Sequence, residues 1–207
     1  MPRETVAHYR QFLDAYQWLE AGSFGWTVYK TDGAVPGVGE IADALSVSGD
    51  VDIQEMAVAE EPLSVPESVV FFEMFADGYF LFQPEESYIS ENVVLENLSV
   101  NGRLWNISWS AGYHSRLACA EAGEINLKWL NFQSSEFPSP RAVHAVEEQI
   151  DLINRILRKE NRGFTLEEMM AVMDLAAGVR LPGDWVDGVR PCMIIHDPLP
   201  QAGWPFD

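Results

Sequence analysis

Residues 68–83, "SVVFFEMFADGYFLFQ", hold two apolar runs that are separated by Asp77-Gly78. An Asp-Gly pair suits a type I′ turn, in which both central residues need a positive φ, and such a turn closes a tight hairpin. Glu73 is the only charged residue inside the runs. Strands this apolar are typical of the middle of a sheet that is covered on both faces. We therefore predict a central β-hairpin here, with Asp77 in its turn.

The segments around this hairpin predict further strands. Residues 24–30 ("FGWTVYK") are β-branched and aromatic, and residues 51–58 carry a weaker strand pattern. Residues 103–111 ("RLWNISWSA") alternate Trp and Ile with Asn and Ser, which indicates a half-buried strand. Residues 114–132 read as two more strands around a turn at Gly123.

Helical patterns lie at the two ends of the chain and in its connections. We predict a helix over 4–20, ended by Gly22, a short helix that ends near Leu45, and further helices over 92–98, 140–159 and 165–177. Thr165 and Glu168 form a capping box at the start of the last helix. A run of strands followed by a run of helices favours an α+β fold. We expect an antiparallel sheet of about six to seven strands, with an N-terminal helix and two C-terminal helices packed on it. Residues 1–187 form one domain in this prediction, and residues 188–207 a Pro-rich, partly docked tail.

The charge of the chain is unevenly distributed. The net charge is −19, and residues 31–102 contain fifteen Asp and Glu without any Lys or Arg. The second half, 103–207, mixes fourteen acids with ten bases. Such a layout disfavours contact with nucleic acid or an anionic membrane and favours a basic partner, although acidity that only keeps a protein soluble explains it as well.

Composition also suggests where the protein works. The N-terminus has charges at Arg3, Glu4 and Arg10 and no apolar core of a signal peptide, and no run is long enough to span a membrane. Cys119 and Cys192 are the only cysteines and show no paired spacing, which fits a reducing compartment. We expect a cytoplasmic protein with two reduced thiols.

No motif for catalysis or cofactor binding is present. The chain lacks a P-loop, a GxSxG and a GxGxxG after a strand, and its carboxylate pairs fall beside prolines in predicted loops. Cys192 and His196 make only half a zinc site, and the acids of "SGDVDIQE" (residues 48–55) lack the spacing of a calcium loop. The helix predicted over 165–177 carries acids where a DNA-recognition helix needs bases. We expect no enzyme activity, no cofactor, no metal and no nucleic-acid binding.

Two stretches resemble an uncharacterised family of actinobacterial acidic single-domain proteins. They are "VLENLSVNGRLWNISWSAGYHSRLACAEAGEI" (94–125) and "MDLAAGVRLPGDWVD" (173–187). The family pattern combines a Leu-Ser before a Trp-bearing strand, an Ala-x-x-Gly hairpin and a Gly-Val-Arg-Leu near the end. The resemblance covers about residues 18–187, and it implies no activity and no catalytic residue.

The sequence thus favours an acidic protein-binding module. The most concrete form is an immunity protein that masks a basic surface or active site of a toxin, since complementary potentials speed encounter and fix partner choice. A polyanion mimic acting on a DNA-binding protein, or a structural domain without an inhibitory role, are the alternatives. The residues expected to contact the partner are the loop acids of the base-free segment: Glu60, Glu61, Glu67, Glu85, Glu86 and Glu91.

Overall fold

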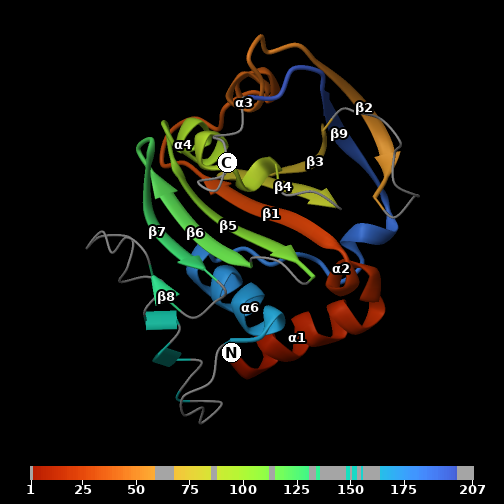
Figure 1. Cartoon of the computed structure of the whole chain (residues 1–207), viewed down its shortest axis with the longest axis vertical. Coiled ribbons are helices and arrows are strands. Elements are labelled where there is room, and N and C mark those ends of the chain that lie inside the picture. Colours follow the sequence, from red (N-terminus) through yellow and green to blue (C-terminus); the bar gives the residue numbers. More distant parts are fainter. Residues whose placement is uncertain are drawn as a thin grey trace, which may run out of the picture.

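One antiparallel sheet of nine strands organises the chain in the computed structural model (Figure 1). The structure describes residues 2–58, 68–84, 88–111, 115–130, 134–135, 148–149, 151–152, 155 and 164–199. In spatial order the strands are β2 (Val51–Ala57), β9 (Val189–Ile195), β3 (Ser68–Phe75), β4 (Gly78–Pro84), β1 (Ser23–Lys30), β5 (Arg103–Ser110), β6 (Arg116–Glu121), β7 (Glu124–Leu130) and β8 (Ser134–Ser135). The predicted α+β class and antiparallel sheet are confirmed, but the predicted number of strands was too low because β8 and β9 were missed.

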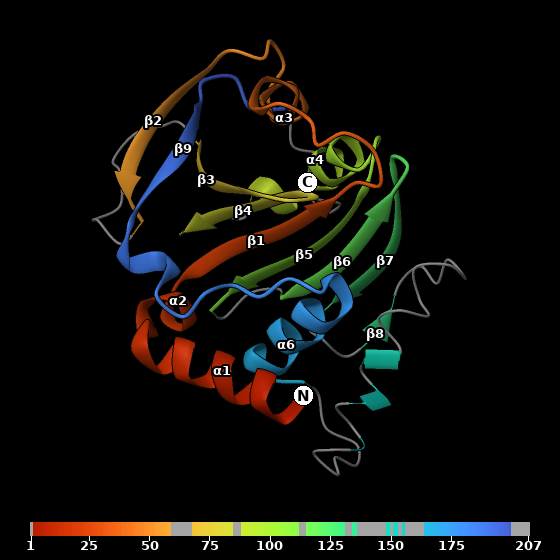
Figure 2. The ribbon, with the colours of Figure 1, turned by 180° about the vertical axis from the view of Figure 1, so that it is seen from behind.

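Helices cover both faces of this sheet (Figures 1 and 2). The long helices α1 (Pro2–Ala15) and α6 (Leu166–Ala177) lie side by side on one face, and the 3₁₀ turn η2 (Trp185–Asp187) belongs to the same layer. The opposite face carries α3 (Val38–Leu45), α4 (Asn92–Leu98) and the 3₁₀ turn η1 (Tyr88–Ser90).

Two apolar cores result from this arrangement, one on each face. Along β1, Phe24, Trp26 and Val28 point into the core under α1 and α6, while Tyr29 packs into the core under α3 and α4. Strand β4 is buried along nearly its whole length. Double coverage explains why the central strands read as continuous apolar runs instead of alternating ones.

The predicted hairpin is β3–β4, and it lies near the middle of the sheet as expected. Its turn differs from the prediction. Gly78 already pairs with Phe75, so Ala76 and Asp77 form the two-residue loop, and Gly78 does not have a positive φ. The glycine is needed for another reason, because a Cβ on Gly78 would lie 1.8 Å from the backbone oxygen of Tyr29 on β1.

The helix ends follow their local chemistry. The Thr165 N–H donates to Glu168 Oε2 at 2.9 Å at the start of α6, and Gly178 ends the helix with φ 68°. The predicted first helix is interrupted: α1 ends at Ala15, a short α2 (Gln17–Ala21) follows, and Tyr16 between them donates from its hydroxyl to Asp187 Oδ2 at 2.5 Å. The helix predicted over 140–159 lies for the most part outside the described residues.

The predicted C-terminal tail contributes to the sheet. Residues 189–195 form β9, which pairs with β2 on one side and β3 on the other. Pro191 has no N–H to donate, and the pairing with β3 covers only Cys192 to Ile195, beginning one residue after the proline. The proline is tolerated because, among the described residues, no strand partner lies opposite it on the β3 side.

Candidate protein-binding surface

The acids that the sequence singled out are covered only in part by the structure. Glu60, Glu61, Glu67, Glu85 and Glu86 lie outside the described residues. Glu91 is described: it precedes α4, accepts the Leu95 N–H with its backbone oxygen at 3.0 Å and is only half-exposed. Burial lowers the pKa of Arg116, and the negative charge of Glu91 offsets part of that shift.

Ten acids of the base-free segment are described. Eight of them are exposed, namely Asp32, Glu40, Asp43, Asp50, Asp52, Glu55, Glu73 and Glu96, and Asp77 and Glu91 are half-exposed. Among these ten, only Asp77 (with Lys30) and Asp52 (with His196) make ion pairs within the described part of the chain. The segment therefore presents most of its negative charge to solvent.

Five of these acids lie on one continuous stretch, from α3 through the following loop into β2. We call this surface the acidic edge: Glu40, Asp43, Asp50, Asp52 and Glu55. Glu40 Oε2 accepts the N–H of Gly37 at 2.8 Å and so fixes the start of α3. The loop after α3 is held by Asp197, which accepts the N–H groups of Val47 and Ser48 with its backbone and side-chain oxygens, at 3.0 and 2.9 Å.

Few cations face this surface. His196 Nε2 lies 3.1 Å from Asp52 Oδ2. Arg190 on β9 is opposite Met56, near the far end of β2, and its guanidinium stacks 5.5 Å from the ring centre of Trp185 instead of reaching the acids. Asp43, Asp50 and Glu55 make no side-chain hydrogen bond or ion pair with any described residue. Their charge is available to a partner.

A second candidate site is a groove of about 710 Å³ at the Lys30 end of β1. It contains Lys30 and Arg103, the two bases that bound the base-free segment, which face each other in register across β1 and β5. Lys30 Nζ lies 2.8 Å from Asp77 Oδ2, and Arg103 Nη2 lies 2.6 Å from Glu121 Oε1. Both cations of the groove thus already have carboxylate partners within the chain.

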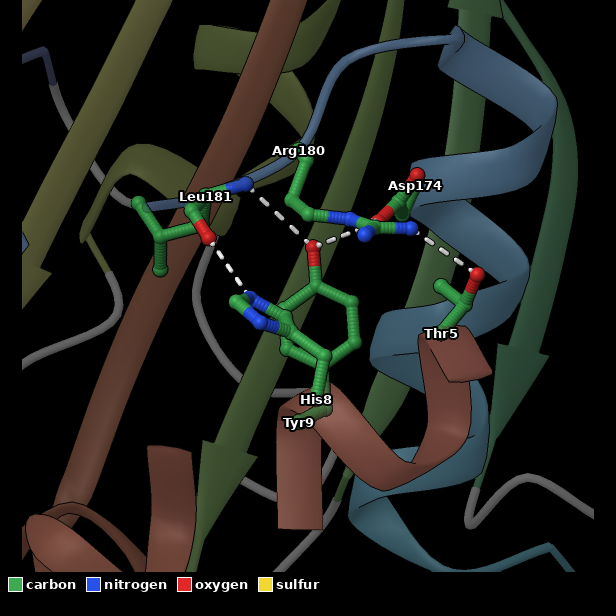
Figure 3. Close-up of polar contacts among 6 residues, drawn as sticks. All are labelled: Thr5, His8, Tyr9, Asp174, Arg180 and Leu181. Atoms are coloured by element: carbon green, nitrogen blue, oxygen red, sulfur yellow. Dashed lines mark hydrogen bonds and ion pairs between the residues drawn. The ribbon is translucent and has the colours of Figure 1, made fainter. Parts of the chain in front are cut away.

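A polar network between α1 and α6 is the third candidate (Figure 3). Tyr9 donates from its hydroxyl to Asp174 Oδ2 at 3.2 Å and accepts the Leu181 N–H at 3.3 Å. Arg180 donates to Asp174 Oδ2 at 2.7 Å and to Thr5 Oγ1 at 2.9 Å. Burial, followed by the Asp174 charge, raises the pKa of Tyr9, so the phenol stays protonated.

The network connects only groups of the chain itself. His8, which neighbours Tyr9 on α1, lies with Nε2 2.9 Å from the Leu181 oxygen (Figure 3). The hydrogen bonds that Figure 3 draws all run between α1, α6 and residues 180–181, and they fasten α1 and α6 to the chain that leaves α6. Its role in this geometry is structural.

The cysteines and the half zinc site do not come together. Cys192 is fully buried in the core under α1 and α6, whereas His196 lies at the surface beside Asp52. Burial raises the pKa of Cys119 to about 12 and that of Cys192 to about 11. No group of three or more His, Cys, Asp or Glu in the described part of the chain could hold a metal ion.

Comparison of the chain with protein-family models, curated proteins and solved structures finds no match in any of the three. The family resemblance of residues 94–125 and 173–187 therefore stays a prediction. None of the described helices is both long and apolar enough to cross a membrane.

Sequence reasoning missed the acidic edge. The acids at 50, 52 and 55 were considered as ligands of a calcium loop, whose spacing they lack, and they were not joined to Glu40 and Asp43. The available signal was the position of all five inside the segment without bases. The stretch that carries them takes its path from the turn between α3 and β2, which is held by Asp197 from the far end of the chain.

Proposed function

We propose that this chain is a non-enzymatic, acidic protein-binding module whose acidic edge docks on a basic surface of another protein. The observation that carries the proposal is the concentration of Glu40, Asp43, Asp50, Asp52 and Glu55 on one stretch, with His196 as their only ion-pair partner among the described residues. A protein that needs charge only for solubility gains nothing from such separation, because interspersed signs with a net excess cause less self-repulsion.

The partner class that fits best is a toxin with a cationic cleft, which would make the chain an immunity protein. An enzyme that acts on a polyanionic substrate needs positive charge at its active site, and an acidic surface can cover it. Association driven by such charges is fast at low salt and slows steeply as ionic strength rises. Salt sensitivity of capture is therefore part of the proposal.

The test compares two variants that change the net charge equally. The edge variant carries Asp43→Asn, Asp50→Asn and Glu55→Gln, which have no side-chain partners among the described residues. The control carries Asp14→Asn, Glu20→Gln and Glu124→Gln, three exposed acids on α1, α2 and β7. Wild type and both variants are used to capture proteins from lysate of the source cells at low and at high salt.

We expect a basic protein that wild type and the control variant retain at low salt and that the edge variant loses. High salt should release it from both. If the two variants capture the same proteins with the same salt dependence, the position of the acids does not matter, and the charge serves solubility alone.

A further inference from the structure

β2 is a long strand with one open side. All seven of its residues pair with β9, from Val51 opposite Ile195 to Ala57 opposite Val189. No strand within the described residues pairs with its other side, where β2 ends the sheet. The opposite end of the sheet is β8, which is only two residues long. Unpaired N–H and C=O groups along an edge strand are a template for a strand from another chain.

Of the usual devices that block such an edge, β2 has only charge, from Asp52 and Glu55. It has no proline and no lysine, and its register against β9 is continuous, without a bulge. Residues 52–55 are exposed on both faces, and Ile53 leaves 56% of its surface accessible. Backbone and side chains are thus both open to a partner.

The side chains of β2 alternate between two surfaces. Val51 packs with the core under α3 and α4, and Met56 with the core under α1 and α6. Ile53 and Glu55 therefore project to the side of α3, and Asp52 to the side of α1. A strand laid along β2 would find a carboxylate on each of its faces and an apolar contact on one.

This pattern selects the occupant. A second copy of the chain would place two acidic β2 strands beside each other, and like charges on neighbouring strands are destabilising. A segment with basic residues avoids that repulsion and pairs with Asp52 and Glu55. We infer that β2 accepts an extended basic segment of the partner as an added strand, in which main-chain hydrogen bonds supply affinity and the acids supply selectivity. The inference rests on the proposed function and specifies how the partner binds.

The experiment uses a defined probe and the intact protein. The probe is a capped peptide, Lys-Lys-Val-Lys-Lys-Val-Lys, which matches β2 in length and presents lysine on both of its faces. Its twin carries N-methyl groups on two adjacent central residues, whose N–H groups face opposite edges of a strand, so the charge is kept and pairing is blocked on both sides. NMR measures the affinity of each peptide and the hydrogen exchange of the Val51–Ala57 amides.

We expect the parent peptide to slow exchange of those β2 amides that are unprotected in the free protein. The twin should bind roughly tenfold or more weakly, because it cannot make the main-chain bonds. Equal affinity of the two peptides, or binding without any added protection in β2, would overturn the added strand.

A second comparison separates this result from the proposed function. Asp52→Asn with Glu55→Gln should weaken the parent peptide, while the control variant with Asp14→Asn, Glu20→Gln and Glu124→Gln should not. If the acids matter but N-methylation does not, the acidic edge binds by charge alone: the proposed function stands and the added strand is wrong. If the acids do not matter for the peptide or for the captured partner, the proposed function itself fails.

Discussion

The acidic edge and the groove at Lys30 use acids of the same base-free segment in opposite ways. In the groove, Asp77 lies 2.8 Å from Lys30, and the neighbouring Arg103 has Glu121 at 2.6 Å. At the acidic edge, only Asp52 of the five acids makes an ion pair with a described residue, and that partner is His196. The charges of the groove are neutralised by ion pairs within the chain, whereas most of the carboxylates of the acidic edge have no such partner among the described residues. The position of a charge relative to the sheet, more than its number, therefore decides whether it is available to a partner.

The largest effect is expected beside the groove, at the residue that follows Asp77. Gly78→Val would place a Cβ 1.8 Å from the Tyr29 oxygen, against the backbone of the central strand, where neither side can move easily. We expect a loss of more than about 3 kcal/mol in the free energy of unfolding, or failure to fold. The control is Gly39→Ala on α3, where a Cβ meets nothing within 4 Å. Urea unfolding should show the control unchanged or stabilised; a Gly78→Val protein as stable as the control would contradict the close approach of β4 to β1.

The second prediction concerns β9, the strand next to β2 in the sheet. Gln54 on β2 is exposed, and Cys192 opposite it on β9 is fully buried, with its pKa raised by burial to about 11. At pH 8 both burial and the lowered thiolate fraction slow its reaction with a disulfide reagent. In a variant with Cys119→Ala and Gln54→Cys, we expect the new thiol to react roughly a hundredfold faster than Cys192.

The unfolded wild type should titrate with two free thiols, one from Cys119 and one from Cys192. Comparable native rates for positions 54 and 192 would show that β9 is not an interior strand.

The third prediction concerns the network of Tyr9, Asp174 and Arg180, where a carboxylate is enclosed by donors instead of facing solvent. Asp174→Ala removes the carboxylate that accepts hydrogen bonds from the Tyr9 hydroxyl and the Arg180 guanidinium. We expect a loss of about 2 kcal/mol in the free energy of unfolding, because the buried Tyr9 hydroxyl and the half-exposed Arg180 guanidinium lose a charged acceptor. Asp43→Asn at the acidic edge is the matched change. Equal urea midpoints for the two variants would show that the network does not fasten α1 to α6.

How much of this was predictable from the sequence depends on the range of the interactions involved. The hairpin, the end of α6 at Gly178 and the strand over 103–110 follow from neighbours in sequence, and the structure confirms them. β9 was missed because a proline such as Pro191 normally indicates a loop. Only the structure shows that β3 does not pair with β9 at this residue, so that a proline fits there. The break at Tyr16 coincides with a contact to Asp187, which no helical periodicity reveals.

The candidate site was predictable only as a segment. The absence of bases from 31 to 102 pointed to an acidic surface, and the loop acids were the natural choice because strands this apolar leave charge to the loops. Of those acids, only Glu91 lies within the described residues, and its charge acts on Arg116 of β6, a proximity that sequence spacing does not show. The acidic edge takes its shape from a helix and a strand that sequence alone does not orient.

The smallest effect tests the opening comparison directly. Asp77→Asn in the groove removes the partner of Lys30, and exposed ion pairs contribute up to about 1 kcal/mol, so a modest loss of stability is expected. Glu55→Gln at the edge removes a carboxylate that has only like charges nearby in its own segment, so stability should stay within about 0.5 kcal/mol or rise slightly. Added salt should narrow the difference in stability between the two variants, because salt weakens both the attraction between charges in the groove and the repulsion between charges at the acidic edge. Urea midpoints of the two variants at low and high salt measure this. If Glu55→Gln destabilises the protein as much as Asp77→Asn does, the Glu55 carboxylate makes a stabilising contact within the chain and is not available to a partner.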